Sequence, residues 1–260
     1  MKTVACLCAF LLVAFGGGAF ADWENIQVID NAGDAGTEPS VAVDQDGTPH
    51  TVYYKYNALY YAHWTDSGWL LEQLAASGWE SARIVSLADG TLVICYVDAS
   101  DNRLKLRYRR PAGSWTTTGS TYNASRYFGD GLAAVATGTK VHVAAIYESE
   151  RLLYFVTDFD AGVVTWTVDG EIAEGLDGDK RNCSLAIDGG GRPHVSYWDG
   201  DSRDLVYAWH DGGTWYSQFV DGDGADVGEA NSIVLRGNET HLFYYDETNG
   251  ALKHATIVRE

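Results

Sequence analysis

Basic residues are scarce in this chain. It has 18 Lys and Arg residues against 36 Asp and Glu, which gives a formal net charge of −18. A chain this acidic repels the phosphates of nucleic acids and the head groups of anionic membranes. The charge therefore argues against nucleic acid as a partner and leaves neutral ligands, cationic ligands and calcium.

Cysteine is also scarce, with four residues, and two of them, Cys6 and Cys8, lie near the N-terminus. The other two, Cys95 and Cys183, fall at unlike positions of the sequence repeat described below. A disulfide is possible, but a disulfide framework is not expected. The fold must therefore depend on its hydrophobic core.

The chain has only one long apolar run, Val4 to Phe15, which follows Lys2 and precedes Ala19-Phe20-Ala21. This pattern is typical of a cleavable secretory signal, and the run is too short to span a bilayer. We predict a signal peptide over residues 1–21 and no membrane insertion. The mature chain is expected to be a monomer, secreted or located in the periplasm.

Helical periodicity of useful length is absent as well, and a β-strand repeat takes its place. Five segments are versions of one strand: GTPHTVYYK (47–55), GTLVICYVD (90–98), KVHVAAIYE (140–148), GRPHVSYWD (191–199) and ETHLFYYD (239–246). They align at His50, Val93, His142, His194 and His241. A glycine-bearing turn joins each segment to a preceding β run, and a polar loop leads to a third run, which predicts antiparallel hairpins.

A fourth strand in each unit is marked by a tryptophan. Trp23, Trp69, Trp115, Trp166 and Trp215 recur every 46 to 51 residues. The fifth unit lacks its own fourth strand, and Trp23 precedes the first unit, so the N-terminal strand is expected to complete the last one. We predict an all-β, five-bladed β-propeller of four-stranded blades over residues 22–260, closed into a ring without an open edge.

The repeat consensus, S-(L/V)-A-(I/V)-D-x-x-G-x-P-H-V-x-Y-x-D followed by L-x-Y-A and G-x-W, resembles the secreted bacterial sialidase-like (BNR-like) propeller repeats. The resemblance covers essentially all of residues 22–260, and glycosidases and sugar-binding lectins share this repeat. It implies that Arg83, in ARIVSLADGTLV (82–93), matches the strand that supplies a clamp arginine in sialidases. Arg126 and Arg181 lie at comparable places in the next two units.

The repeated histidines are interpreted as scaffold. A catalytic base is needed once, at the substrate, whereas four histidines occupy equivalent strand positions. We expect each of them to hydrogen-bond to the backbone of a neighbouring blade.

Function is instead expected in the loops that lead into the first strand of each unit, at the mouth of the central channel. These loops cover residues 30–40, 75–83, 121–132, 174–184 and 221–232. The candidate catalytic carboxylates are Glu38, Glu80, Asp130 and Glu229. The candidate ligand-binding residues are Trp79, Tyr127, Arg83, Arg126, Arg181, Asn182 and Asn231.

Three functions remain open, and the first is favoured. A non-catalytic, lectin-like module would stack a glycan or other small ligand on an aromatic ring and bind its hydroxyls with polar side chains. A sialidase-like glycoside hydrolase would need two carboxylates roughly 5–10 Å apart. A protein-interaction or structural platform at the cell surface would use the acidic loops.

No cofactor is predicted, although calcium is possible. DGDSRD (199–204) and DGDGAD (221–226) each offer three aspartates in a short loop, and hard cations bind several such oxygens. Plain turn aspartates are the favoured interpretation of both loops.

Overall fold

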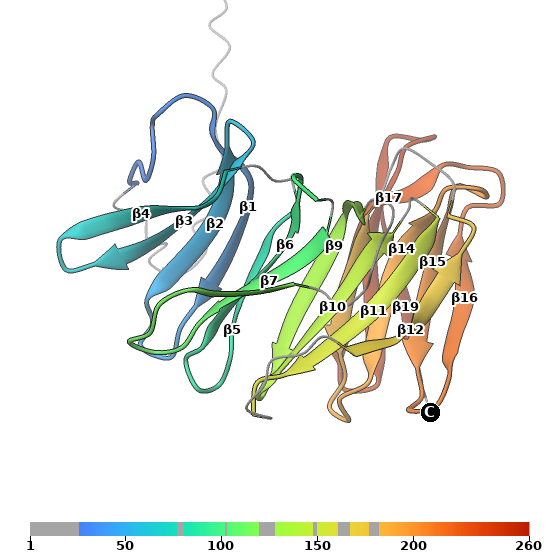
Figure 1. The fold of residues 1–260 in the computed structure, drawn as a ribbon. Helices are drawn as coiled ribbons and strands as arrows, with labels where there is room; N and C mark the ends of the chain where they lie inside the picture. The colour runs from blue at the N-terminus through green and yellow to red at the C-terminus, as the bar shows by residue number, and fades with distance from the viewer. Residues whose placement is uncertain are drawn as a thin grey trace, which may run out of the picture.

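A computed structural model of the chain describes residues 26–76, 81–101, 103–119, 128–147, 150–160, 167–176 and 182–259. These residues form an all-β protein of five antiparallel sheets, which follow one another in chain order (Figure 1). The described part of the chain contains no helix with the length and apolarity to cross a membrane.

Within each sheet, every strand pairs with the one before it in the chain. The first sheet consists of β1 (Ala35–Val43), β2 (Pro49–Lys55), β3 (Ala58–Thr65) and β4 (Gly68–Ala75). The second consists of β5 (Arg83–Ser86), β6 (Leu92–Asp98), β7 (Arg103–Arg109) and β8 (Thr116–Gly119). The third consists of β9 (Phe128–Thr137), β10 (Lys140–Tyr147), β11 (Arg151–Asp158) and β12 (Thr167–Glu174).

The fourth sheet consists of β13 (Cys183–Ile187), β14 (Pro193–Asp199), β15 (Asp204–His210) and β16 (Trp215–Asp221). The fifth has three strands among the described residues: β17 (Val227–Arg236), β18 (Glu239–Asp246) and β19 (Ala251–Val258). Residues 26–30, which the tryptophan spacing predicts to be the end of a strand, are not in a strand here. Trp23 lies outside the described residues.

The strand register confirms the predicted alignment of the five units. His50 pairs with Ala42, and the four aligned residues pair with equivalent positions of their own first strands: Val93 with Val85, His142 with Val135, His194 with Ala186 and His241 with Val234. The turn glycine has nearly the same left-handed conformation in three units, with φ of 79° at Gly47, 81° at Gly90 and 79° at Gly191. Glycine adopts this φ without the steric cost that a side chain would bring.

The core is divided among the joints between successive sheets. Four buried apolar clusters lie between the first and second, second and third, third and fourth, and fourth and fifth sheets. The first strands also contact one another in order, from β1 through β5, β9 and β13 to β17. Two of these contacts use the same hydrogen bond, because Ile84 N donates to Ser40 Oγ (3.1 Å) and Ile233 N donates to Ser184 Oγ (3.2 Å).

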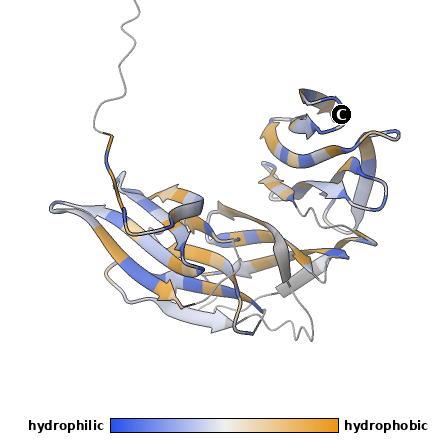
Figure 2. Ribbon diagram, turned by 90° about the horizontal axis from the view of Figure 1, so that it is seen from above, coloured by the Kyte–Doolittle hydropathy of each residue, from blue (hydrophilic) through white to orange (hydrophobic). Residues whose placement is uncertain are grey.

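The sheets follow an arc, and the ring is not closed. In Figure 1 the first sheet lies at the left and the fifth lies behind the fourth, and Figure 2, seen from above, shows the sheet that carries the C-terminus at the other end of the arc. Among the described residues, β1 and β17 have no contact comparable to those between the other neighbouring first strands. The structure therefore shows five sheets of the predicted type, without the predicted fifth joint.

The two cysteines of the strands are buried and form no disulfide. Burial raises the pKa of each thiol to about 12, so both are inert packing residues at neutral pH.

Candidate functional site

The predicted site residues that the structure describes lie on or beside the first strands. Glu38 is exposed on β1 with a φ of 47°, and Arg83 at the start of β5 is partly buried. Arg83 Nη1 donates to its neighbour's carbonyl, Ala82 O (2.9 Å). Glu229 is partly buried on β17, and Asn182 precedes β13.

Asn231, also on β17, is already engaged within the fold. Its Oδ1 accepts a hydrogen bond from Ser196 Oγ (2.6 Å), and its Nδ2 donates to Gly228 O (2.9 Å). The bond from Ser196 holds β17 against β14, which gives Asn231 a structural role between the fourth and fifth sheets.

Five of the predicted site residues lie outside the described residues: Trp79, Glu80, Arg126, Tyr127 and Arg181. Asp130 lies on β9, but its side chain is outside the described part. The ligand and catalytic roles assigned to them stay predictions.

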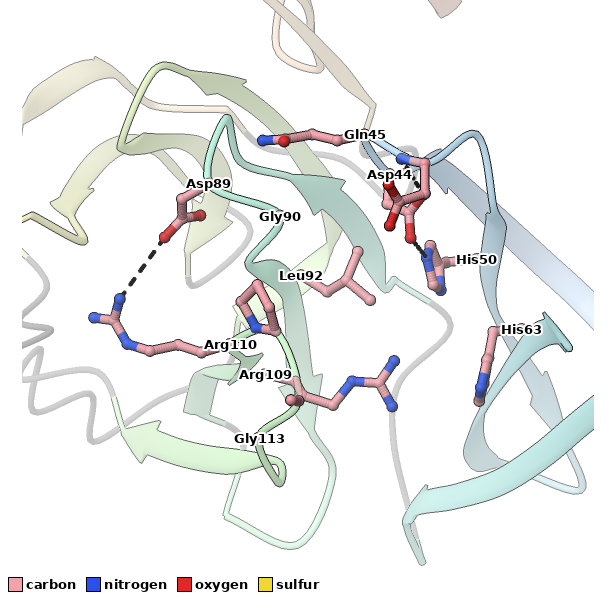
Figure 3. A pocket seen from close by; sticks show the side chains of 13 residues that line it. Asp44, Gln45, His50, His63, Asp89, Gly90, Leu92, Arg109, Arg110 and Gly113 are labelled. Carbon is pink, nitrogen blue, oxygen red and sulfur yellow. Dashed lines mark hydrogen bonds and ion pairs between the residues drawn. The ribbon is translucent and has the colours of Figure 1, made fainter.

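Two cavities lie at the opposite end of the sheets from the loops that lead into the first strands. None of the predicted site residues lines either cavity. The larger, called here the first cavity, lies between the first and second sheets and has a volume of about 660 Å³ (Figure 3). Its walls are the turn after β1, the turn before β6 and the turn after β7, with side chains from β2 and β3. The side chains that matter most below are Asp44, His50, His63 and Arg109.

A chain of hydrogen bonds forms one wall of the first cavity. His50 Nε2 lies 3.0 Å from Asp44 Oδ2, and His50 Nδ1 lies 2.7 Å from the hydroxyl of Tyr61. Arg109 Nη2, from the second sheet, donates to the same hydroxyl (2.6 Å). The chain therefore joins two sheets through side chains that face a cavity.

The electrostatics of this wall follow from burial and from its donors. Burial, opposed by the charge of Arg109, raises the pKa of Tyr61 to about 12, so its hydroxyl stays protonated. Burial acts to raise the pKa of Asp44, but hydrogen bonds from His50 and from Thr48 N outweigh it and hold that pKa below its ordinary value. Asp44 is thus a fixed, negatively charged acceptor.

His63 and Arg109 complete the wall. The guanidinium of Arg109 lies over the rings of Tyr61 and Trp115, 5.0 Å from each ring centre, which fixes its orientation. Figure 3 shows it pointing across the cavity toward His50 and His63. His63 Nδ1 is buried without a hydrogen-bond partner. Burial and then the charge of Arg109 lower the pKa of His63, which leaves the ring neutral at neutral pH.

The second cavity, of about 430 Å³, lies between the fourth and fifth sheets at the equivalent place. Asp188 and His194 take the positions of Asp44 and His50, and His194 Nδ1 lies 2.7 Å from the hydroxyl of Tyr207. In the third sheet the acid is replaced by Thr137, whose hydroxyl lies 2.6 Å from His142 Nε2. The histidine–tyrosine pair therefore recurs in the first, third and fourth units.

Three of the four histidines have the repeated structural role that the sequence predicts, because they are buried and paired in the same way. Their partner differs from the prediction. Each ring bonds to a tyrosine hydroxyl on the next strand of its own sheet, and not to the backbone of a neighbouring sheet. The fourth, His241, is only partly buried and bonds to His254 (3.2 Å).

Sequence reasoning missed the two cavities. The available signal was the recurrence of an Asp six residues before the histidine together with a Tyr on the following strand, in the first and fourth units only.

For the loops considered for calcium, the structure shows protein donors on the carboxylates. Asp221 Oδ2 accepts hydrogen bonds from Tyr244 Oη (2.8 Å) and Lys253 Nζ (2.8 Å). Asp199 Oδ1 accepts from Asp201 N (3.1 Å). Across the residues that the structure describes, no three His, Cys, Asp or Glu side chains are grouped as a metal would require.

Comparison with known proteins shows the type of fold. No family model matches the chain, and no curated protein matches it in sequence. Among solved structures, it is similar to the BP39L lectin from Burkholderia pseudomallei, with 15% identity, a TM-score of 0.62, and coverage of 86% of this chain and 67% of the lectin.

The SapL1 lectin, solved in complex with α-methyl fucoside, gives 15% identity, a TM-score of 0.56 and coverage of 86% and 81%. A polysaccharide lyase, the PL25 ulvan lyase, gives 11% identity, a TM-score of 0.51 and coverage of 85% and 70%. At these identities the likeness establishes an all-β fold of the β-propeller type.

Proposed function

We propose that this protein is a non-catalytic, lectin-like β-propeller that binds a glycan in the first cavity. The observation that carries the proposal is the wall between the first two sheets, where the carboxylate of Asp44, the imidazole of His63 and the guanidinium of Arg109 converge on one cavity. A sugar presents vicinal hydroxyls that both donate and accept, and this wall supplies both kinds of partner in fixed positions.

The electrostatics favour binding over hydrolysis. A glycosidase needs a general acid whose pKa is raised, so that it is protonated near neutral pH. The pKa of Asp44 is lowered instead, so this carboxylate accepts hydrogen bonds and does not donate a proton. Similar folds include lectins, one of them solved with a bound fucoside, and this agrees with the proposal.

The test is glycan binding by the purified chain. A glycan array identifies the preferred oligosaccharide, and calorimetry gives its affinity. Arg109→Ala should weaken binding about tenfold or more, because a charge-assisted hydrogen bond contributes about 1.5–3 kcal/mol. Arg103→Ala, which removes an exposed arginine of β7 away from the cavity, is the matched control.

Two outcomes would contradict the proposal. One is unchanged affinity in Arg109→Ala. The other is turnover of chromogenic glycosides by the purified chain, which would favour the hydrolase that the sequence leaves open.

We also propose that the five sheets close into a five-bladed ring, with residues 22–30 as the outer strand of the fifth blade. Contacts of residues 26–30 repeat those of outer strands elsewhere. Asp30 Oδ2 accepts from Tyr53 Oη (2.9 Å) on the first sheet, as Asp221 at the end of β16 accepts from the equivalent Tyr244 (2.8 Å) on the fifth.

A second contact follows the same rule. Trp69 Nε1 donates to Gln27 Oε1 (3.0 Å), as Trp115 Nε1 of the next sheet donates to Glu72 on β4 (3.2 Å). Residues 26–30 therefore lie along the first sheet where the outer strand of a preceding sheet would lie.

The exposed apolar side chains at the two ends of the arc also support closure. Val41 is 68% exposed, although its equivalents Ile84 and Leu185 are 3% and 6% exposed against the preceding sheet. Phe243 of the fifth sheet is 45% exposed, although its equivalent Val52 is fully buried against the following sheet. Joining the two ends would bury both faces, and burial of apolar area is favourable.

Finally, we propose that residues 1–21 direct export and are then removed. Amino-terminal sequencing of the protein recovered outside the cytoplasm should begin at Asp22.

A further inference from the structure

The second cavity differs from the first because two of its buried nitrogen atoms, on His194 and Arg259, have no hydrogen-bond partner. In the first cavity, His50 Nε2 is bonded to Asp44 (3.0 Å) and Arg109 Nη2 to Tyr61 (2.6 Å). In the second, the nearest carboxylate oxygen, Asp188 Oδ2, lies 3.6 Å from His194 Nε2, which is too long for a hydrogen bond. The side chain of His194 is nevertheless buried, since the residue is only 5% exposed.

Arg259 is the second unpaired group. Its guanidinium lies over Trp209, 3.8 Å from the ring centre, and over Tyr207, 4.9 Å from that centre. Its Nη2 is buried without a hydrogen-bond partner. Within the described part of the chain, no carboxylate lies within ion-pair distance of it, in a protein with twice as many acids as bases.

An unpaired, partly buried cation beside an unpaired buried ring nitrogen is unfavourable unless a ligand supplies acceptors. A planar anion fits best, because two oxygens of a carboxylate can accept from a guanidinium and from a second donor at once. The aromatic rings beneath Arg259 hold its fork in one orientation, which prepares it for such a ligand.

Two acidic residues, Asp188 and Asp211, also line this cavity, and one carboxylate oxygen of each accepts hydrogen bonds from backbone N–H groups of its own turn. Asp188 Oδ1 accepts from Gly190 N (2.8 Å) and Arg192 N (2.8 Å). Asp211 Oδ1 accepts from Gly213 N (2.8 Å) and from Thr214 N (2.9 Å). Backbone donors thus offset part of the charge that would repel an anion.

We infer that the second cavity is a separate binding site for an acidic sugar of the uronic acid class. The carboxylate of the sugar accepts hydrogen bonds from Arg259 Nη2 and from His194 Nε2–H. The site goes beyond the glycan site proposed for the first cavity, since it lies between other sheets and selects another ligand class.

The experiment is calorimetry with three monosaccharides: D-galacturonate, D-galactose and D-galactose 6-sulfate. Galacturonate should bind, and galactose should bind at least about tenfold more weakly, because it leaves both nitrogen atoms unpaired. Equal affinity for galactose would overturn the inference. Equal or higher affinity for the sulfate would overturn the assignment to a carboxylate.

Substitutions locate the site. Arg259→Gln should weaken galacturonate binding about tenfold or more, and Arg259→Lys, which keeps the charge but loses the fork, should fall between it and the native chain. Arg236→Gln removes a neighbouring exposed arginine of β17 that does not line the cavity, so it should bind as the native chain does. Unchanged affinity in Arg259→Gln would overturn the inference.

Competition separates this site from the first cavity. Galacturonate is titrated into the protein saturated with the neutral glycan that the array identifies, and its affinity should not change. Loss of galacturonate binding under saturation would show one shared site and overturn the inference. If no neutral glycan binds, the proposal for the first cavity fails, and the titration of galacturonate still decides the second.

Discussion

Tyr61 connects the two sides of the first cavity through one hydroxyl group. It is fully buried, and its hydroxyl has His50 of its own sheet and Arg109 of the second sheet as partners. Removing that oxygen leaves a buried imidazole nitrogen and a guanidinium nitrogen without partners, and such groups destabilise a protein more than the loss of one exposed bond would.

We therefore expect Tyr61→Phe to lower the free energy of unfolding by about 1–3 kcal/mol, measured by urea denaturation. Tyr56→Phe is the matched control, because Tyr56 is exposed in the turn between β2 and β3. A loss no larger than that of the control would show that the hydrogen-bond chain contributes nothing to stability.

Some residue-level features could be predicted from the sequence and others could not. The burial of His50, His142 and His194 could be predicted, because a residue that recurs at equivalent strand positions of several units serves the scaffold. Their tyrosine partners were missed, because a side-chain partner depends on which cross-strand neighbours share a face, and the predicted strands had no fixed register between their second and third members.

At the scale of elements, β18 and β19 form the last described hairpin, and Asp246 holds its turn. This side chain is fully buried, and it accepts from Lys253 Nζ (2.7 Å) and from Asn249 N (2.9 Å). The hydrogen bond from Lys253, with those from Asn249, lowers the pKa of Asp246 from 3.8 to about 2.

The sign of the pH effect follows from that shift. Because the folded-state pKa is lower than the unfolded one, Asp246 stabilises the fold above pH 4 and loses this contribution as the pH falls toward 2. Asp246→Asn should therefore be less stable than the native chain at neutral pH. Its free energy of unfolding should also fall less steeply between pH 4 and pH 2.

Chemical denaturation at a series of pH values provides the measurement. Asp223→Asn, which changes an exposed residue before β17, should keep the native dependence of the unfolding free energy on pH. If Asp246→Asn also kept the native dependence between pH 4 and pH 2, the carboxylate of Asp246 would not be the group that titrates.

The repeat explains why the strands were predictable and the cavities were not. Each strand follows from local signals within one unit, namely the turn glycine and the alternation of side chains. A cavity needs residues from two units at once. The arginine of each cavity also comes from a different position of the repeat. Arg109 pairs with Leu92, whereas the equivalent residue of the fifth sheet, Thr240, pairs with Ile257. Arg259 lies two residues beyond Ile257. No alignment of the units could bring the two arginines together.

At the scale of the whole molecule, closure of the ring is the prediction that the described residues do not show. Sequence spacing predicts five equal units, and the described residues show four complete joints and exposed apolar side chains on the sheets at the two ends of the arc. Closure depends on an interaction between the two ends of the chain, which no local pattern encodes. Within this chain, the contacts of Asp30 and Gln27 are the observations that point to it.

Hydrogen exchange tests this closure directly. If residues 22–30 pair with β19, the amides of β19 that do not bond to β18 should exchange slowly in the full chain and rapidly in a chain lacking residues 22–30. The outward amides of β12 are the internal control, because β12 is the outer strand of the third sheet and should exchange alike in both chains. Rapid exchange of the β19 edge in the full chain would mean that the fifth sheet keeps an open edge, and the protein would then be an arc of five sheets rather than a ring.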